Sequence, residues 1–212
     1  MPTQRHVLFH LLTTLSSIIV LFTAATATPS PSAASETVIK CRKKYPLTHQ
    51  RENFIIHTTA LINETNTKLL EQKNQLALEF QGHKFDPTWI AYKDPNIMHF
   101  CTEYKVSCIN QTNEHIREEL QLKINTIPTP LVLAQAILES NWGTSRFYKQ
   151  GHNLFGMHCY RKGCGIVPRG KTSHYFEVTR YSNDSQSIGA YFKTINTNPS
   201  YQEFRELRKN IT

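Results

Sequence analysis

The sequence predicts an α+β fold that is mostly α-helical and carries a small lobe of short β-strands. Apolar residues recur at helical spacing through most of residues 50–141 and again through 184–208, a pattern typical of amphipathic helices. Residues 157–181 between them hold Gly and Pro and alternate at 175, 177 and 179, which indicates a hairpin or short strands. The length of 212 residues suits a single domain.

The expected helices follow from the apolar spacing and from residues that begin or end helices. Gly82 ends a long amphipathic helix, and Ile116 and Leu120 point inward from a later one. Asp184 or Ser185 caps the helix that follows the strand lobe. In order, we expect helices over residues 50–81, 95–104, 112–123, 130–141, 184–195 and 199–208, with a short helical turn at 144–149.

The first 40 residues predict export. Arg5 precedes an apolar run from Val7 to Ala27, which ends in the small residues Ala25-Thr-Ala27, so residues 1–27 have the order of a secretory signal peptide. The run is also nearly long enough to span a bilayer, and an uncleaved anchor is the alternative. The remaining chain divides into a flexible linker (28–40), an N-terminal helical region that packs on the domain (41–126) and the domain core (127–209).

The chain is basic, with a formal net charge of +8 and a pI of about 9.3. A basic surface suits a polyanion such as nucleic acid, anionic lipid or an acidic cell wall. No nucleic-acid-binding motif is recognisable, and the basic residues are scattered, so we expect general attraction to an acidic wall or membrane surface, and no nucleic-acid partner.

Export permits disulfides, and the chain has five cysteines. Cys159 and Cys164 flank a four-residue loop, Cys101 and Cys108 make a plausible second pair, and Cys41 is left over. The alternative is a zinc site made of Cys159, Cys164 and two of the three nearby histidines, although this spacing is looser than that of a usual zinc knuckle. No other metal and no cofactor is expected. The three histidines are His152, His158 and His174.

Glu139 is the candidate catalytic acid. It lies in the last turn of an apolar helix that Thr129 caps and Gly143 ends, and at helical spacing it shares a face with Gln135 and Trp142. Because that face is mostly apolar, we expect a partly desolvated carboxyl with a raised pKa. A protonated carboxylic acid beside an aromatic wall is what general-acid cleavage of a glycosidic bond requires. The alternative is a glutamate at the end of a core helix that points to water.

Five short motifs in fixed order carry a family resemblance. The helix reads A-Q-A-x-L-E-S-x-W-G, Asn153-Leu-Phe-Gly-Met157 follows it, and Tyr181-Ser, Ser187-x-x-x-Tyr191 and Asn198-Pro-x-Tyr201 come later. In this order the motifs resemble the glucosaminidase domain of glycoside hydrolase family 73. The chain is most similar to the Bax-type proteins of Gram-negative bacteria, through Lys44-Tyr45-Pro46, Ile127-Pro128-Thr129 and the Cys159-x4-Cys164 loop. The resemblance implies a lysozyme-like fold over residues 40–209.

The resemblance also implies roles for individual residues. Tyr191 matches a tyrosine that the family places opposite the acid, where it orients water or stabilises positive charge on the sugar. Asn153 and Phe155 match the floor of the glycan groove, and Trp142 its wall. Each of these residues has a purely structural alternative, in a turn or in the core. The full set of expected substrate-binding residues is Gln135, Ser140, Trp142, Asn153, Phe155, Tyr175 and Tyr181.

A second carboxylate is harder to find. Glycosidases usually use two, and many family members carry the second on the β lobe. Here that place holds Cys159-Tyr-Arg-Lys-Gly-Cys164, which has no acid. Glu177 is the nearest candidate, but on an exposed strand we expect it to be solvated. Without it, Tyr191 alone or the acetamido group of the substrate would have to place the water.

The sequence therefore predicts a monomeric, exported peptidoglycan hydrolase of the periplasm or cell envelope, or a secreted one. It would be an endo-β-N-acetylglucosaminidase that cleaves the β-1,4 bond after N-acetylglucosamine. The main alternative is a non-catalytic wall protein that holds glycan in the same groove. A third reading is a different glycan, such as the core of a host N-glycan. The chain would be a membrane protein only if residues 1–27 are retained.

Overall fold

The computed structural model describes residues 47–170 and 175–209. The chain divides into the segment Met1–His49 and one compact unit, Gln50–Thr212. The expected signal peptide, linker and Cys41 lie outside the described residues. Within 47–170 and 175–209, the helices are all too short or too polar to cross a membrane.

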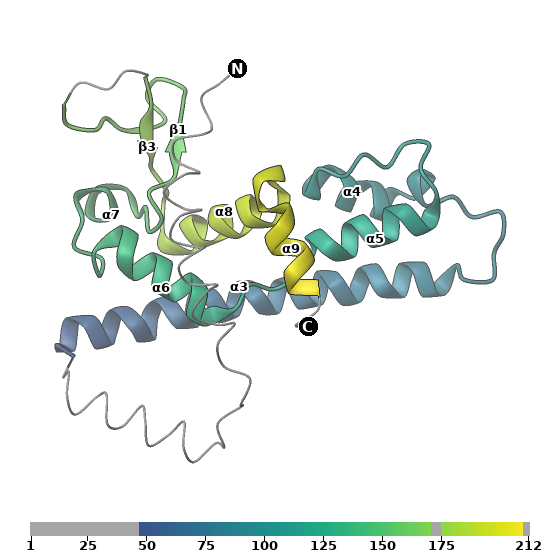
Figure 1. Cartoon of the computed structure of the whole chain (residues 1–212), viewed down its shortest axis with the longest axis horizontal. Coiled ribbons are helices and arrows are strands. Elements are labelled where there is room, and N and C mark those ends of the chain that lie inside the picture. Colours follow the sequence, from purple (N-terminus) through teal and green to yellow (C-terminus); the bar gives the residue numbers. More distant parts are fainter. Residues whose placement is uncertain (1–46, 171–174, 210–212) are drawn as a thin grey trace, which may run out of the picture. The chain divides into compact units, whose positions relative to one another are not determined.

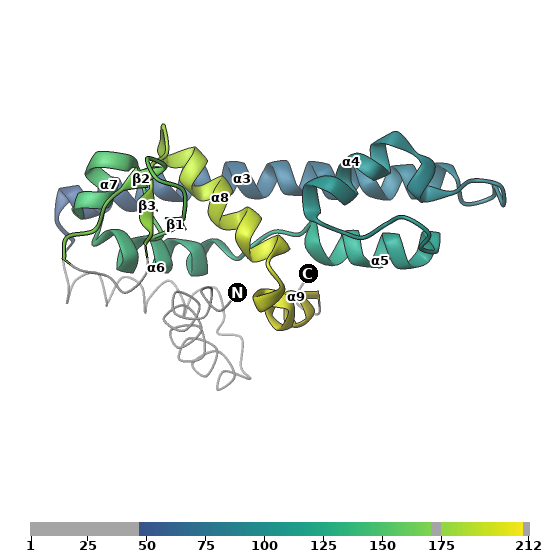
Figure 2. The same ribbon diagram turned by 90° about the horizontal axis from the view of Figure 1, so that it is seen from above.

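The compact unit is mostly helical, as the sequence predicts, and one long helix organises it. Helix α3 (His49–Gly82) buries a narrow stripe along its whole length through Phe54, Thr58, Ile62, Leu69 and Leu76. The views in Figures 1 and 2 place α6 and α7 beside the first half of α3, and α4 and α5 beside its second half. The other helices are α4 (Pro95–Tyr104), α5 (Asn113–Lys123), α6 (Thr129–Ser140), α7 (Arg146–Gly151), α8 (Asp184–Thr197) and α9 (Gln202–Lys209), with single 3-10 turns at Ala91–Lys93 and Pro199–Tyr201.

Several helix ends follow from capping chemistry. The Asp94 carboxylate accepts from the backbone N–H groups of Asn96 and Ile97 at the start of α4, and the Thr112 hydroxyl accepts from His115 N at the start of α5. Helix α4 begins at Pro95, where the sequence predicts, and α5 begins at Asn113, one residue later than predicted. In α5 the side chains of Ile116 and Leu120 are fully buried, also as predicted.

Other predicted helix ends were wrong by one to three residues. Helix α6 begins at Thr129 after Pro128, and it ends where Asn141 adopts a left-handed conformation, before Gly143. Asn183, and neither Asp184 nor Ser185, caps α8 through a hydrogen bond from Gln186 N. Helix α7 begins at Arg146, two residues later than the turn predicted at 144.

The lobe of short strands is present. Strands β1 (His158–Cys159), β2 (Gly165–Ile166) and β3 (Glu177–Thr179) form an antiparallel sheet in the order β1-β3-β2. Cys159 pairs with Glu177, and Gly165 with Thr179. A side chain at position 165 would collide with the backbone of β3, since a Cβ there would lie 2.0 Å from Val178 O.

Both predicted disulfides are present, Cys101–Cys108 and Cys159–Cys164. The first ties the end of α4 to the following loop, and the second closes the loop between β1 and β2. The zinc alternative needed the thiolates of Cys159 and Cys164, and the second disulfide uses both sulfur atoms.

Candidate active site

Glu139 stands at the end of a helix whose other face is firmly packed. In α6, Val132 and Ala136 are completely buried, so the register of the helix is fixed by its apolar side. Glu139 itself is exposed. The buried face of the helix belongs to Val132, Gln135 and Ala136, and Glu139 lies at its edge, so the partial desolvation expected for its carboxyl stays a prediction.

The turn after α6 has an unusual backbone. Asn141, Trp142 and Gly143 all have positive φ, at 50°, 58° and 71°. A tryptophan in this region is uncommon, since its Cβ crowds the backbone. Gly143 is required for a second reason, because a Cβ there would lie 3.0 Å from the rings of both Phe54 and Tyr148. The turn thus brings the chain down onto α3 immediately after Glu139.

A second tight turn meets Glu139 from the other side. In the segment 153–157, Gly156 has φ 63°, and a Cβ at this position would lie 3.5 Å from Glu139 Oε2. Asn153 shapes the turn: its amide nitrogen donates to Met157 O (2.9 Å) and Thr179 O (2.8 Å), and its oxygen accepts from Met157 N (3.0 Å). Both polar atoms of the buried Asn153 amide therefore already have hydrogen-bond partners within the chain.

Tyr191 and Phe155 form the aromatic base beside this carboxylate. Their rings stack with centroids 4.1 Å apart, and both side chains are buried. Burial raises the pKa of Tyr191 above its usual value, and the charges of Tyr201 and Glu139 add to this effect. The influence of Glu139 means that α6 and α8 bring its carboxylate near the phenol. The structure therefore gathers Glu139, Gly156, Phe155 and Tyr191 in one place.

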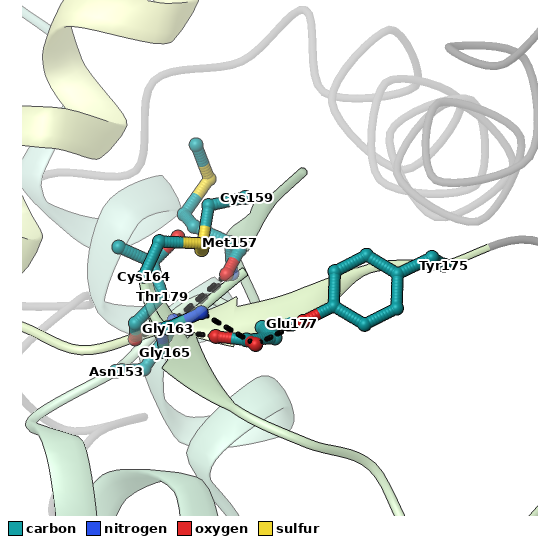
Figure 3. The surroundings of a disulfide bond; sticks show 9 residues. All are labelled: Asn153, Met157, Cys159, Gly163, Cys164, Gly165, Tyr175, Glu177 and Thr179. Atoms are coloured by element: carbon teal, nitrogen blue, oxygen red, sulfur yellow. Dashed lines mark hydrogen bonds between the residues drawn. A yellow bond between two sulfur atoms is a disulfide. The ribbon is translucent and has the colours of Figure 1, made fainter. Parts of the chain in front are cut away.

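Glu177 is buried, so the solvated position predicted for it was wrong. Its side chain lies under the loop between β1 and β2, where it accepts hydrogen bonds from Gly163 N (2.8 Å), Gly165 N (2.6 Å) and the Tyr175 hydroxyl (Figure 3). These hydrogen bonds hold the pKa of Glu177 below its usual value, and the bond from the Tyr175 hydroxyl has the largest effect. Glu177 is thus an ionised carboxylate that orders the disulfide loop.

The other candidate residues differ in how exposed their side chains are. Gln135 and Ser140 are buried, and the Ser140 hydroxyl donates to Ala136 O and accepts from Gly143 N. Trp142 packs edge-on against Phe54, under the guanidinium of Arg51. Tyr181 is half-buried and burial raises its pKa, whereas Tyr175 is exposed.

Gln135 has a further property. Its side-chain nitrogen and oxygen are buried with no hydrogen-bond partner among the described residues. An unpaired buried amide costs free energy, and a bound water or ligand atom commonly satisfies such a group. Gln135 lies one helical turn before Glu139, so this amide is on the same side of α6 as the carboxylate.

Sequence reasoning missed a polar cluster around Asp184. Its carboxylate is 2.7 Å from His152 Nδ1, 2.9 Å from the Tyr148 hydroxyl and 3.0 Å from His57 Nε2. Burial and this carboxylate raise the pKa of Tyr148 to about 12. The partners lie up to 127 residues away in sequence, so no local sequence pattern predicts these contacts. The Asn183-x-x-Gln186 spacing, by contrast, is a capping signal that identifies the true start of α8.

Two groups of potential metal ligands occur in the described part of the chain. Besides the disulfide pair with Glu177, only Glu79, His83 and Asp94 come close enough together. These three already have other contacts: Asp94 caps α4, Glu79 accepts from Asn96, and the His83 ring stacks on Trp89.

Two comparisons with known proteins found matches to this chain. Residues 114–212 match the glucosaminidase family model, described as mannosyl-glycoprotein endo-beta-N-acetylglucosaminidase. This stretch contains Glu139, Gly156 and Tyr191. This part of the chain is therefore similar to the glucosaminidase family.

The curated relative found is Protein bax of Escherichia coli (strain K12). It is 28% identical to this chain over 184 residues, which cover 86% of the chain and 64% of the relative. Together the two matches support the interpretation of the chain as a Bax-type glucosaminidase-domain protein. The chain spans less than two thirds of the relative's length, and no solved structure matches it significantly.

Proposed function

We propose that this protein is an exported peptidoglycan hydrolase, an endo-β-N-acetylglucosaminidase that uses Glu139 as its general acid. The observation that carries the proposal is the meeting of Glu139 with the Gly156 turn and the Tyr191 phenol inside the matched domain. The glucosaminidase family supports action on a glycan, and the bond cleaved, after N-acetylglucosamine, is our specific proposal.

The exposure of Glu139 fits a role that begins when substrate binds. A glycan lying along the Gly156 turn would cover the carboxyl and remove water from it. Loss of water favours the protonated form of a carboxylic acid, which is the form that donates a proton to the leaving oxygen. A Cβ at Gly156 would already contact Glu139 Oε2 at 3.5 Å, so a larger side chain there would compete with a sugar for the space beside this carboxylate.

We propose that the Tyr191 hydroxyl assists the reaction of a sugar bound beside Glu139. Its raised pKa keeps the phenol neutral at physiological pH, so its hydroxyl can donate or accept a hydrogen bond. In that role it would orient the attacking water or face the positive charge that develops on the sugar ring. The stack on Phe155 fixes the ring in position.

Glu177 is the candidate for a second catalytic carboxylate. Glu177 is ionised, as a base or nucleophile must be, but its oxygens are held by Gly163, Gly165 and Tyr175. This arrangement favours a route in which Tyr191 or the acetamido group of the substrate places the water. It also favours the alternative function, a wall protein that binds glycan without cleaving it.

Export is supported by the two disulfides, which persist in oxidising compartments. We propose the periplasm or cell envelope, with a monomeric protein released by cleavage after Ala27. The N-terminal segment itself lies outside the described residues.

The test is digestion of purified peptidoglycan by the chain from Thr28 onward, beside Glu139→Gln, with products read by mass spectrometry. New reducing-end N-acetylglucosamine is expected from the wild type only, since losing the acid costs about 10²- to 10⁴-fold in rate. Equal pelleting of both proteins with the wall serves as the control for folding and binding. Cleavage by both would refute the role of Glu139, and cleavage by neither, with binding intact, would establish the non-catalytic alternative.

A further inference from the structure

The strand lobe carries an unbalanced charge. Its described residues, 157–170 and 175–181, hold four exposed cationic side chains and a single carboxylate, Glu177, which is buried. Burial lowers the pKa of His158, which favours its neutral form, so this histidine is not counted among the cations. The outer surface of the lobe is therefore cationic in the part that the structure describes. The four cationic residues are Arg161, Lys162, Arg169 and Arg180.

Two of these cations stand on a loop that is held rigid. Arg161 and Lys162 lie between the disulfide-bonded Cys159 and Cys164, and Cys164 N donates to Arg161 O across the turn. Beneath the loop the Glu177 carboxylate binds Gly163 N and Gly165 N (Figure 3). The side chains that face outward thus start from an ordered backbone, and less entropy is lost when they bind a partner.

The lobe is also internally tied to the rest of the unit. Arg146 of α7 donates from Nη2 to Val167 O (2.9 Å), and Tyr181 N donates to Gly151 O (2.9 Å). The loop therefore presents its charge from a fixed position relative to α7.

The loop lies within reach of the candidate catalytic carboxylate. Gly156 is next to Glu139, and Arg161 follows Gly156 by only five residues. Five residues span at most about 18 Å even when fully extended. A glycan of a few sugars bound at Glu139 is long enough to reach the loop when it runs toward the strand lobe, and charged groups on it would then meet Arg161 and Lys162.

We propose that the Cys159–Cys164 loop is a substrate-recognition element that binds carboxylate groups carried by the glycan. The inference rests on the proposed function, because it places this second contact on the same substrate. Arg161 offers a planar guanidinium that can pair with a carboxylate through two hydrogen bonds, and Lys162 adds a mobile positive charge. The contact would select wall glycan with free carboxylates over neutral glycan.

The experiment measures binding to purified peptidoglycan in the Glu139→Gln background, which prevents cleavage during the assay. One portion of wall is left native and a second has its carboxylates converted to neutral amides. The test variant adds Arg161→Gln and Lys162→Gln. The matched control adds Lys84→Gln and Lys93→Gln, two exposed lysines from the segment between α3 and α4, at the opposite end of α3 from the lobe (Figure 1).

On native wall, the test variant should bind about threefold to tenfold more weakly, the range for two exposed charge pairs, with a smaller dependence on salt. On amidated wall the test and control variants should bind alike. Equal loss in the control variant, or equal loss on amidated wall, would overturn the proposal, because either result means general charge attraction. Unchanged binding of the test variant to native wall would overturn it as well.

A second variant, Cys159→Ser with Cys164→Ser, keeps every charge but releases the loop. Binding to native wall should again fall, and thermal unfolding identifies any loss of the global fold. Activity of the wild-type chain is scored separately. Carboxylate-dependent binding without any cleavage refutes the proposed hydrolase and leaves this recognition element standing, whereas cleavage with charge-independent binding does the reverse.

Discussion

Replacing Arg208 with methionine should destabilise the fold substantially. This arginine on α9 is buried, and its guanidinium reaches back into the end of α5 and into α8. Burial lowers its pKa to about 10, so it stays charged at neutral pH. Its Nη1 donates to Thr126 O (2.9 Å), Asn196 Oδ1 (2.8 Å) and Asn125 O (3.3 Å), and its Nη2 to Leu122 O (3.1 Å).

The magnitude follows from these four bonds. Each hydrogen bond contributes about 1 kcal/mol net to the free energy of unfolding. Buried oxygen atoms that lose this donor cost about as much again. The variant in turn avoids the cost of removing the guanidinium from water, which offsets part of this loss. Methionine keeps most of the apolar stem. We therefore expect a loss of about 3 kcal/mol, which lowers Tm by about 6–12 °C in a chain of this size.

The assay is thermal and urea unfolding of Arg208→Met beside Arg208→Lys and Arg161→Met. Lysine keeps the charge but cannot reach the same set of oxygens, so it should lose about half as much. Arg161 is exposed, and its replacement should change the unfolding free energy by no more than about 0.5 kcal/mol. If Arg208→Met unfolds within about 0.5 kcal/mol of the wild type, the four bonds do not stabilise α9 as described.

Three further results are expected. Tyr191→Phe keeps the stack on Phe155, so Tm should hardly change while cleavage slows about tenfold or more; an unchanged rate contradicts its proposed role. Removing the Cys101–Cys108 disulfide by double serine substitution should cost about 2 kcal/mol in urea unfolding, as estimated for a short closed loop, and no cost would contradict that estimate. The pKa of Glu177 lies below its ordinary value of 4.5 in the folded state, so its stabilising effect is present above that pH and is lost as pH falls through the folded value. The protection factors of the Gly163 and Gly165 amides, taken relative to the intrinsic exchange rate at each pH, should therefore fall in acid. In Glu177→Gln they should be low already at neutral pH, and equal protection in wild type and variant there would contradict the anchoring role.

Local chemistry accounts for the parts of the fold that the sequence predicts well. Asp94 and Thr112 cap their helices because each side-chain oxygen meets N–H groups two or three residues away. Thr129 has the same chemistry, but its hydroxyl donates to Asn63 Oδ1 (2.8 Å), a residue of α3 far away in sequence. The helix then begins at Thr129 without a side-chain cap. Such a competition is decided by tertiary packing, which the local sequence does not contain.

The candidate site divides in the same way. The motifs around Glu139, Gly156 and Tyr191 predict which residues come together, since they mark one helix end, one tight turn and one buried helix face. They do not predict how exposed the candidate carboxylates are. Alternation along β3 predicts a solvated Glu177, but this strand is the middle one of the sheet and the disulfide loop folds over it. The covering loop is a long-range feature without a periodic signal.

The different surroundings of the two carboxylates give them different tasks. Glu139 is exposed, with a glycine turn beside it, so substrate can reach it and change its surroundings. Glu177 is already surrounded by donors, and those donors hold it ionised. A group in that state is a poor proton donor, and freeing it as a base would cost the hydrogen bonds that order the loop. This contrast is consistent with our proposals of a single acid at Glu139, of a water placed by Tyr191 or by the substrate, and of a structural Glu177 whose loop binds carboxylates of the glycan.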